Sequence, residues 1–171
     1  AVCLVKEQGI EVVAITFVTP FFGDNSATIQ AAEALGIELV TRDVSKEYLE
    51  LLHHPKYGYG KNFNPCIDCH GFMLRKAGEY MLEAGASFLF TGEVLGQRPM
   101  SQNRIALATV EKLSGYRGLT LRPLSARLLP VTIPEERGWI DRDRLLDISG
   151  RSRKRQIQLA QDYGIPDYPA P

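Results

Sequence analysis

Short apolar runs alternate with amphipathic stretches along the first 122 residues. The runs at residues 11–18, 37–44, 87–91 and 119–122 have the length and β-branched character of buried strands. Helical spacing of apolar residues separates them at 24–35, 67–84 and within 99–113. Strands alternating with helices indicate an α/β fold, so we expect a Rossmann-like parallel sheet with helices on both faces. In the helix at 24–35, the spacing places Ala27, Ala31, Ala34 and Leu35 on the buried face.

The two ends of the chain depart from this alternation. Residues 1–8 look helical, yet no strand precedes them, although the first strand of such sheets and its loop usually bind phosphate. We therefore expect an opening strand and phosphate loop ahead of Ala1. Residues 1–123 are predicted to form the nucleotide-binding domain. Residues 124–171 are predicted to form a basic, helical appendage on it, with a helix at 152–163.

Composition and charge narrow the class of protein. A chain of 171 residues, 44% of them hydrophobic, has room for one main domain with a full core. Its three cysteines are an odd and small number, which argues against a secreted disulfide scaffold and favours the reducing cytoplasm. No apolar run approaches the roughly 18 to 20 residues of a membrane span, so no membrane partner is expected.

Charge is divided unevenly along the neutral chain. Residues 1–52 carry three basic and eight acidic side chains, whereas residues 117–155 carry ten basic and five acidic ones. Such asymmetry predicts that one half of the molecule faces a polyanion such as RNA. The alternative is a solvated surface on which charges happen to cluster.

Cys66 and Cys69 are the most informative residues of the chain. They lie in Asn64-Pro65-Cys66-Ile67-Asp68-Cys69-His70, at the beginning of the helix predicted for 67–84. A helix N-terminus favours the thiolate and lowers the pKa of a thiol, and Asp68 and His70 supply an acid or base within one turn. The sequence therefore predicts a reactive or metal-bound thiol pair, with Cys66, Cys69 and Asp68 as the catalytic candidates.

Three other interpretations of the pair remain open. Cys-x-x-Cys-His is also a c-type haem attachment motif, although the α/β pattern does not suit a haem protein. Zinc would need four ligands, which His70 with His53 or His54 would complete. The remaining alternative is two reduced cysteines without a role.

Two further stretches carry candidates for binding anions. Thr91 and Gly92 follow a predicted strand at the carboxyl edge of the sheet, where they permit close approach of a phosphate, and Arg98 lies six residues on. The last helix begins after Gly150, with Arg151, Ser152, Arg153 and Lys154 at its N-terminus. An ordinary strand-to-helix turn and a solvated basic helix are the alternatives.

Taken together, the order of these motifs over residues 1–122 resembles the PP-loop ATP pyrophosphatase superfamily. The similarity is to its tRNA-thiolating branch, the 2-thiouridylases and 4-thiouridine synthetases. Asn-Pro-Cys-x-x-Cys at 64–69 and Gly-Arg-Ser-Arg at 150–153 carry it. The resemblance implies an adenine nucleotide alpha hydrolase-like fold and an enzyme that uses ATP and Mg²⁺ to adenylate a uridine of tRNA. A sulfur donor protein or sulfide then supplies sulfur, and AMP leaves.

Carried over to this chain, the resemblance implies specific roles. Cys66 or Cys69 handles sulfur, Thr91 and Gly92 line the adenylate pocket, and Thr16, Phe17 and Val18 lie near the adenine. Glu93 follows the Thr-Gly pair, where thiouridylases commonly have histidine. The Ser-Gly-Gly-x-Asp-Ser pyrophosphate loop is absent from the sequence and is expected ahead of Ala1.

Some relatives bind an iron–sulfur cluster on three cysteines, of which Cys3 or one beyond Pro171 would be the third here. The resemblance also implies a Gly-Gly-Cys segment after Pro171. The competing prediction is a non-catalytic RNA- or metal-binding module in which the cysteine pair holds zinc or a cluster. A generic nucleotide-binding fold would explain the sheet but would leave both cysteines without a role.

Overall fold

The computed structural model describes residues 1–23, 26–59 and 65–165. Its elements, in chain order, are α1 (Val2–Lys6), β1 (Val13–Val18), α2 (Ser26–Leu35), β2 (Glu38–Asp43), α3 (Ser45–His53), α4 (Cys66–Glu83), β3 (Leu89–Phe90), α5 (Arg104–Ser114), β4 (Thr120–Leu121), η1 (Ala126–Leu128), α6 (Ile133–Glu136), η2 (Arg142–Arg144) and α7 (Lys154–Asp162). Each predicted strand and helix therefore has a counterpart, with ends that differ by a few residues.

Both strand pairs are parallel, as the alternation of strands and helices predicts. β1 pairs with β2 in register from Val13 opposite Glu38 to Val18 opposite Asp43. β3 pairs with β4 over two residues, Leu89 opposite Thr120 and Phe90 opposite Leu121. The two pairs are separate sheets within the described residues, so the expectation of one continuous sheet is corrected, because no ladder of hydrogen bonds joins β1 to β3. Mixed helices and small parallel sheets of this kind are compatible with an α/β fold.

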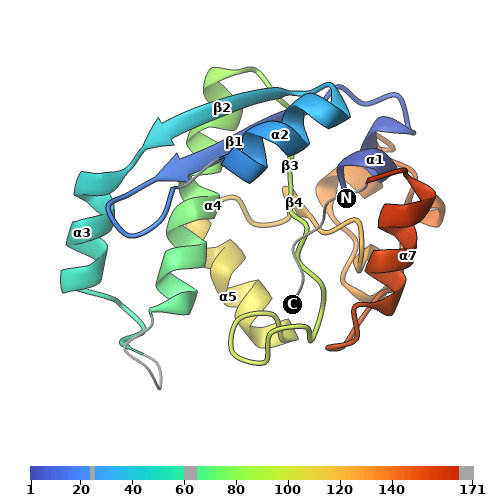
Figure 1. Cartoon of the computed structure of the whole chain (residues 1–171). Coiled ribbons are helices and arrows are strands. Elements are labelled where there is room, and N and C mark those ends of the chain that lie inside the picture. The colour runs from blue at the N-terminus through green and yellow to red at the C-terminus, as the bar shows by residue number, and fades with distance from the viewer. Residues whose placement is uncertain (24–25, 60–64, 166–171) are drawn as a thin grey trace.

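Figure 1 shows β1 and β2 across the top of the molecule, with α4 and α5 beneath them and with α1 and α7 together at one side. Two apolar clusters hold these layers together. One is formed by Val44, Tyr48 and Phe72, which join β2, α3 and α4, and Phe17 of β1 packs against it. The other cluster consists of Val5, Val12, Leu121, Ala126, Ile140 and Leu145.

The second cluster joins the two predicted parts of the chain. Ala126, Ile140 and Leu145 come from the segment after residue 123, and they are at most 3% exposed. Main-chain hydrogen bonds reinforce the packing, with the N–H of Leu146 donating to Pro123 and the N–H of Ile148 donating to Leu124. The stretch that follows β4 thus shares a core with the stretch that precedes it.

Helix α2 does not bury the face that its spacing predicts. Ala32 is the buried residue of this helix, whereas Ala27, Ala31 and Ala34 are exposed. The predicted starting residue, Asp24, lies outside the described residues. Alanines fall at several helical phases here, so spacing alone does not select the buried face; contact with the neighbouring strand does.

No helix in the described ranges is long and apolar enough to cross a membrane.

Candidate functional site

The cysteine pair lies at the start of α4, as the sequence predicts. Cys66 is the first helical residue, and the N–H of Cys69 donates to the carbonyl of Pro65 one turn earlier at 2.8 Å. Both thiols are free and half-buried. Asn64 of the motif lies outside the described residues. Three residues separate the thiols on the helix, so both project from its first turn on the same side.

Tyr48 of α3 contacts the second thiol. Its phenol donates a hydrogen bond to Cys69 Sγ at 3.6 Å, and its ring packs against Phe22 and Phe72. Burial raises the pKa of the Cys69 thiol, and the neighbouring Cys66 adds to that shift, while the Tyr48 hydroxyl opposes it. This direction is opposite to the lowered pKa expected at a helix N-terminus, and desolvation is its largest cause. Cys69 is a protonated, partly buried thiol.

Asp68 anchors a loop to the first turn of α4. Its two carboxylate oxygens accept hydrogen bonds from the main-chain N–H groups of Lys56, at 3.1 Å, and Tyr57, at 2.8 Å. The side chain is buried. Through these two hydrogen bonds, Asp68 holds the loop that follows α3 beside the cysteines. The acid–base role stays a prediction.

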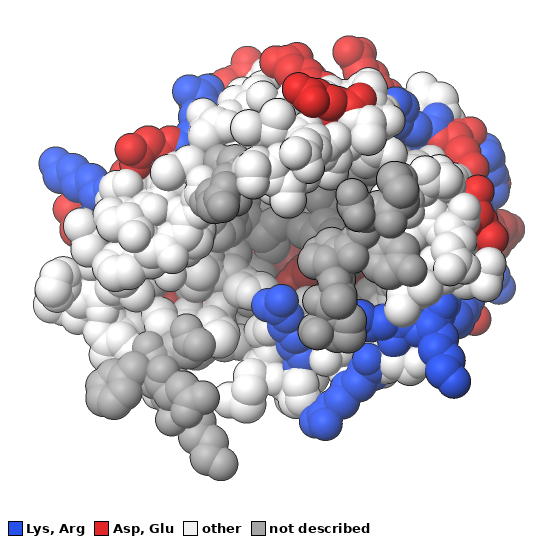
Figure 2. Space-filling model, viewed as in Figure 1, with Lys and Arg blue, Asp and Glu red and all other residues white. Residues whose placement is uncertain are grey.

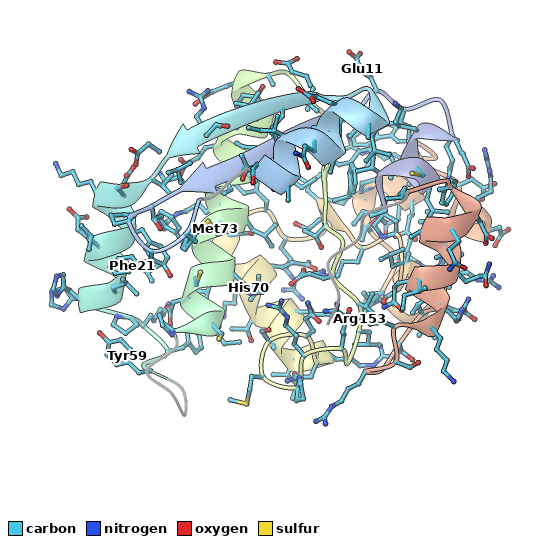
Figure 3. All side chains as sticks on the ribbon, in the orientation of Figure 1. Glu11, Phe21, Tyr59, His70, Met73 and Arg153 are labelled. Atoms are coloured by element: carbon cyan, nitrogen blue, oxygen red, sulfur yellow. The ribbon has the colours of Figure 1, made fainter. Side chains whose placement is uncertain are left out.

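His70 and Glu93 join the cysteine helix to the loop that follows β3. His70 Nδ1 lies 3.2 Å from Glu93 Oε1. The other oxygen of Glu93 accepts from the Thr91 hydroxyl at 3.0 Å and from Arg122 Nε at 3.0 Å. Figure 3 shows His70 directed from α4 toward the middle of the molecule. Two motifs separated by more than 20 residues in sequence therefore share one hydrogen-bonded cluster.

Glu93 is ionised and held in place in this cluster. Burial alone would raise the pKa of Glu93, but the hydrogen bond from His70 and the charge of Arg122 outweigh it, so the pKa lies below its ordinary value. The side chain of Arg122 is only 3% exposed and also pairs with Glu111 of α5. A buried guanidinium between two carboxylates fixes Glu93 opposite the start of α4.

Sequence reasoning missed Tyr48, Arg122 and Glu111. Arg122 follows the run Leu119-Thr120-Leu121, and a charged residue directly after a buried strand signals a site at the carboxyl edge of a sheet. Tyr48 and Glu111 lie on amphipathic helices. The one sequence signal that could have identified them is a polar group on the face of the helix that is predicted to be buried.

Within the described part of the chain, the other residues predicted to contact a nucleotide, Gly92 and Thr16 to Val18, are not part of the hydrogen-bonded cluster around Glu93. Gly92 is exposed, and nothing lies within 4 Å of the position of an added Cβ, so its backbone is open to a ligand. Phe17 lies in the apolar cluster with Val44, Tyr48 and Phe72. Because side chains alternate along a strand, Thr16 and Val18 leave the opposite face of β1. β1 and β3 belong to separate sheets, so no strand pairing holds Thr16–Val18 to Thr91–Glu93.

The two predicted phosphate-binding stretches are joined by main-chain contacts. Leu95 forms a parallel bridge with Ser149, and the N–H of Gly150 donates to the carbonyl of Leu95 at 2.8 Å. Ser125 reinforces the junction, because its hydroxyl accepts from Leu95 N–H and donates to the Ile148 carbonyl. The loop that carries Arg98 therefore lies beside the segment that carries Arg151 to Lys154.

Charges are unevenly distributed over the face of the molecule that Figure 2 shows. Most Lys and Arg side chains of this face lie along its lower part, below a hollow, whereas acidic side chains lie mainly above it. Arg151, Ser152 and Lys154 are exposed and Arg153 is half-buried, directed toward the middle of the molecule (Figure 3). The N-cap of α7 is Arg153 and not Ser152, whose hydroxyl lies 3.5 Å from Lys154 N.

The described part of the chain offers the two thiols no group of further metal ligands. Among the described residues, no group of three or more His, Cys, Asp or Glu side chains is arranged to hold a metal ion. Cys3 belongs to α1, which lies next to α7 and away from α4 (Figure 1). The zinc and iron–sulfur assignments of Cys66 and Cys69 stay predictions.

Comparison with known proteins gives no relative: no family model, curated protein or solved structure matches this chain.

Proposed function

We propose that this protein is an ATP-dependent enzyme that thiolates a uridine in tRNA. The observation that carries the proposal is the His70–Glu93 contact of 3.2 Å, which brings the cysteine helix to the Thr91–Glu93 loop. A thiol pair beside a strand-end loop is the arrangement that sulfur transfer to an activated nucleotide requires. The proposal includes a Rossmann-like arrangement of helices around the two parallel strand pairs, β1–β2 and β3–β4.

The residues of the loop after β3 fit a bound nucleotide. ATP, with Mg²⁺, would supply the adenylate that activates the uridine oxygen as a leaving group. Gly92 offers an open backbone, and Thr91 is oriented by its hydrogen bond to Glu93. Glu93 is itself held by Arg122 and His70, so the loop is rigid before any ligand binds. These side chains orient the nucleotide.

The two thiols act in different steps of sulfur transfer. One cysteine thiolate attacks the terminal sulfur of a donor persulfide, so that the donor S–S bond breaks, the donor thiol leaves and the cysteine becomes a persulfide. Its terminal sulfur forms the new bond to the activated uridine carbon, and the bond from that carbon to the adenylate oxygen breaks. The second thiol then attacks the first sulfur, releases the thiolated base and leaves a Cys66–Cys69 disulfide, which a thiol reductant reduces. Spacing of three residues in a helical turn is compatible with that disulfide.

Burial suggests which thiol acts first. Cys69 is held protonated beside Tyr48, whereas Cys66 is the first residue of α4. We therefore assign the persulfide to Cys66 and the resolving step to Cys69.

The basic side of the molecule fits the tRNA backbone. Arg98, Arg151 and Lys154 are exposed on stretches that the Leu95–Gly150 hydrogen bond holds together. Phosphate contacts of this kind position an RNA without reading its sequence.

The activation step is tested with the natural protein, including any residues that precede Ala1. Incubated with ATP, Mg²⁺ and total tRNA, it is expected to release AMP and pyrophosphate in an RNA-dependent manner. The Cys66→Ser and Cys69→Ser variants are expected to keep this activity, because activation precedes sulfur transfer.

Failure of the natural protein to form AMP with any RNA would end the proposal. Stoichiometric zinc bound by the cysteines, together with RNA binding that is indifferent to ATP, would instead support the non-catalytic module.

A further inference from the structure

A cavity of about 330 Å³ lies between α5, β4 and the segment from η1 to α6. Its walls are mostly apolar, with Leu107, Leu121, Leu129 and Val131 among the lining residues. Cavities of this size, with apolar walls and a few polar groups, are typical of small-molecule sites. The cysteine pair and the Thr91–Gly92 backbone are not part of its lining.

Two buried hydrogen-bond donors lining this cavity lack partners. Thr120 is 1% exposed and Arg122 is 4% exposed, and both lie on the cavity wall. Within the described residues, neither Thr120 Oγ1 nor Arg122 Nη2 has a hydrogen-bond partner. Buried polar groups without a partner destabilise a fold, so their retention points to a ligand that supplies the missing acceptor. Residues 120 and 122 leave the same side of an extended chain, so a single acceptor group serves both.

The charges around the cavity specify the ligand further. Arg104, Arg117 and Arg122 line it, together with Glu111 and Glu135. Arg122 pairs with Glu111 and Glu93, and Glu135 pairs with Arg142. Arg104 and Arg117 have no ion-pair partner in the part of the chain that the structure describes. With Glu93 and Arg142 included, four arginines face three carboxylates, and one excess positive charge favours a monoanion over a dianion such as phosphate.

We propose that this cavity binds a small carboxylic acid with an apolar, aromatic-sized body. The carboxylate accepts hydrogen bonds from the Thr120 hydroxyl and Arg122 Nη2, and the apolar body fills the space between Leu107, Leu129 and Val131. Arg117 and Arg104 lie at the surface and attract the anion to the mouth. Because Arg122 also holds Glu93, the bound acid touches the same guanidinium that orients the loop after β3.

The test uses naphthoate, its neutral analogue naphthamide and inorganic phosphate, each titrated into the full chain by calorimetry and by thermal unfolding. Naphthoate is expected to bind and to raise the unfolding temperature, because a ligand that binds only the folded state stabilises it. Naphthamide and phosphate are expected to show no heat of binding at the same concentrations. Equal binding of naphthamide, binding of phosphate but not naphthoate, or no binding by any of the three would overturn the proposal.

Three variants locate the site. Thr120→Val keeps the shape of the side chain but removes the hydroxyl, and is expected to weaken naphthoate binding about tenfold while the protein stays folded. Ala108→Phe places a ring at the cavity wall from an exposed position of α5 and is expected to abolish binding. Arg117→Gln is expected to weaken binding about threefold, whereas Arg75→Gln, an exposed arginine of α4 outside the cavity, leaves it unchanged. Unchanged affinity in both Thr120→Val and Ala108→Phe contradicts the assignment.

Discussion

The side chains around Cys69 and Glu93 have opposite effects on the ionisation of these two groups. Burial keeps the Cys69 thiol neutral, although the Tyr48 hydroxyl donates a hydrogen bond to it. Glu93 is also largely buried, yet the hydrogen bond from His70 and the charge of Arg122 keep it ionised. The difference between the neutral thiol and the ionised carboxylate comes from these two partners of Glu93.

Replacing Tyr48 by Phe is expected to make Cys69 less reactive. The phenol lowers the pKa of the thiol by its hydrogen bond, so its loss raises that pKa further and leaves less thiolate at a given pH. Both proteins carry Cys66→Ser, so that iodoacetamide labelling at Cys69 can be followed by peptide mass spectrometry between pH 7 and 10. The labelling rate is expected to fall about threefold in Tyr48→Phe. Tyr57→Phe, at an exposed residue, is the control; faster labelling in Tyr48→Phe would contradict the assigned hydrogen bond.

Replacing Glu93 by Gln is expected to destabilise the protein at neutral pH by about 3 kcal/mol, because Arg122 remains buried with one carboxylate fewer. The pKa of Glu93 is lowered in the folded state, so its contribution to the free energy of unfolding is present above its ordinary value of 4.5 and is lost as pH falls through the folded value. Urea unfolding at pH 7 and pH 3.5 measures both effects.

The difference between the wild type and Glu93→Gln should therefore shrink at pH 3.5. A difference that is the same at both pH values would show that Glu93 acts through packing alone. Glu79→Gln, at an exposed residue of α4, is the matched control and is expected to change little.

At the scale of single residues, the sequence identifies those candidate site residues that belong to a short continuous motif. Cys66, Cys69, Thr91 and Gly92 stand out by spacing and by their position after or before an element. Arg122 and Tyr48 act through partners on other elements, and no spacing rule connects residue 48 with 69 or 122 with 93. For the same reason the raised pKa of Cys69 could not be read from the helix N-terminus alone.

Among the elements, α4 and α5 form a close contact through two glycines. A Cβ at Gly71 would lie 2.7 Å from the Cβ of Leu113, and one at Gly78 would overlap the ring of Tyr116. Small residues at these positions let the helices approach. α5 ends at Gly115, whose φ of 83° suits glycine, and the chain then turns to bring Tyr116 back onto α4.

The Gly78→Ala variant is expected to lower the free energy of unfolding by about 1 to 3 kcal/mol, even though alanine favours a helix by about 1 kcal/mol. The cost arises from displacing the Tyr116 ring. Chemical denaturation checks it, with Leu82→Ala at an exposed position of the same helix as the control, which is expected to change stability by less than about 0.5 kcal/mol. A stabilised Gly78→Ala protein would show that propensity outweighs the contact.

Much of the order of elements could be predicted because strand and helix periods differ along the first 122 residues. Pairing between distant strands carries no local signal, which is why the separation of β1–β2 from β3–β4 was not foreseen. The buried face of α2 was missed for a related reason: alanines at several phases leave the choice to tertiary contact.

In the whole molecule, chain stretches far apart in sequence meet on one basic side. The bridge between Leu95 and Ser149 joins the loop after β3 to the segment before α7, and the acidic N-terminal stretch lies mainly on the other side of the hollow (Figure 2). The uneven charge of the sequence therefore becomes a difference between two sides of the molecule. If the protein binds tRNA as proposed, this difference gives the RNA one preferred direction of approach.

Affinity for tRNA is expected to depend steeply on salt. Replacing Arg151 and Lys154 by Gln should weaken binding about tenfold at low salt and reduce the slope of log affinity against log salt by about 2. Arg42→Gln, on β2 and paired with Glu83, is the control and should leave both quantities unchanged. Fluorescence anisotropy over a salt series measures them, and an unchanged slope in the double variant would place the RNA elsewhere.

The central claim, that the cysteine helix and the Thr91–Glu93 loop together thiolate tRNA, is tested most directly by analysing the RNA product. The natural protein, in molar excess over the tRNA, is incubated with tRNA, ATP, Mg²⁺ and glutathione persulfide, and the digested nucleosides are examined by mass spectrometry. The account predicts an ATP-dependent thiouridine that is lost in Cys66→Ser and strongly reduced in Cys69→Ser. Formation of thiouridine at the wild-type level in the Cys66→Ser, Cys69→Ser double variant, or its absence with the wild type, would contradict it.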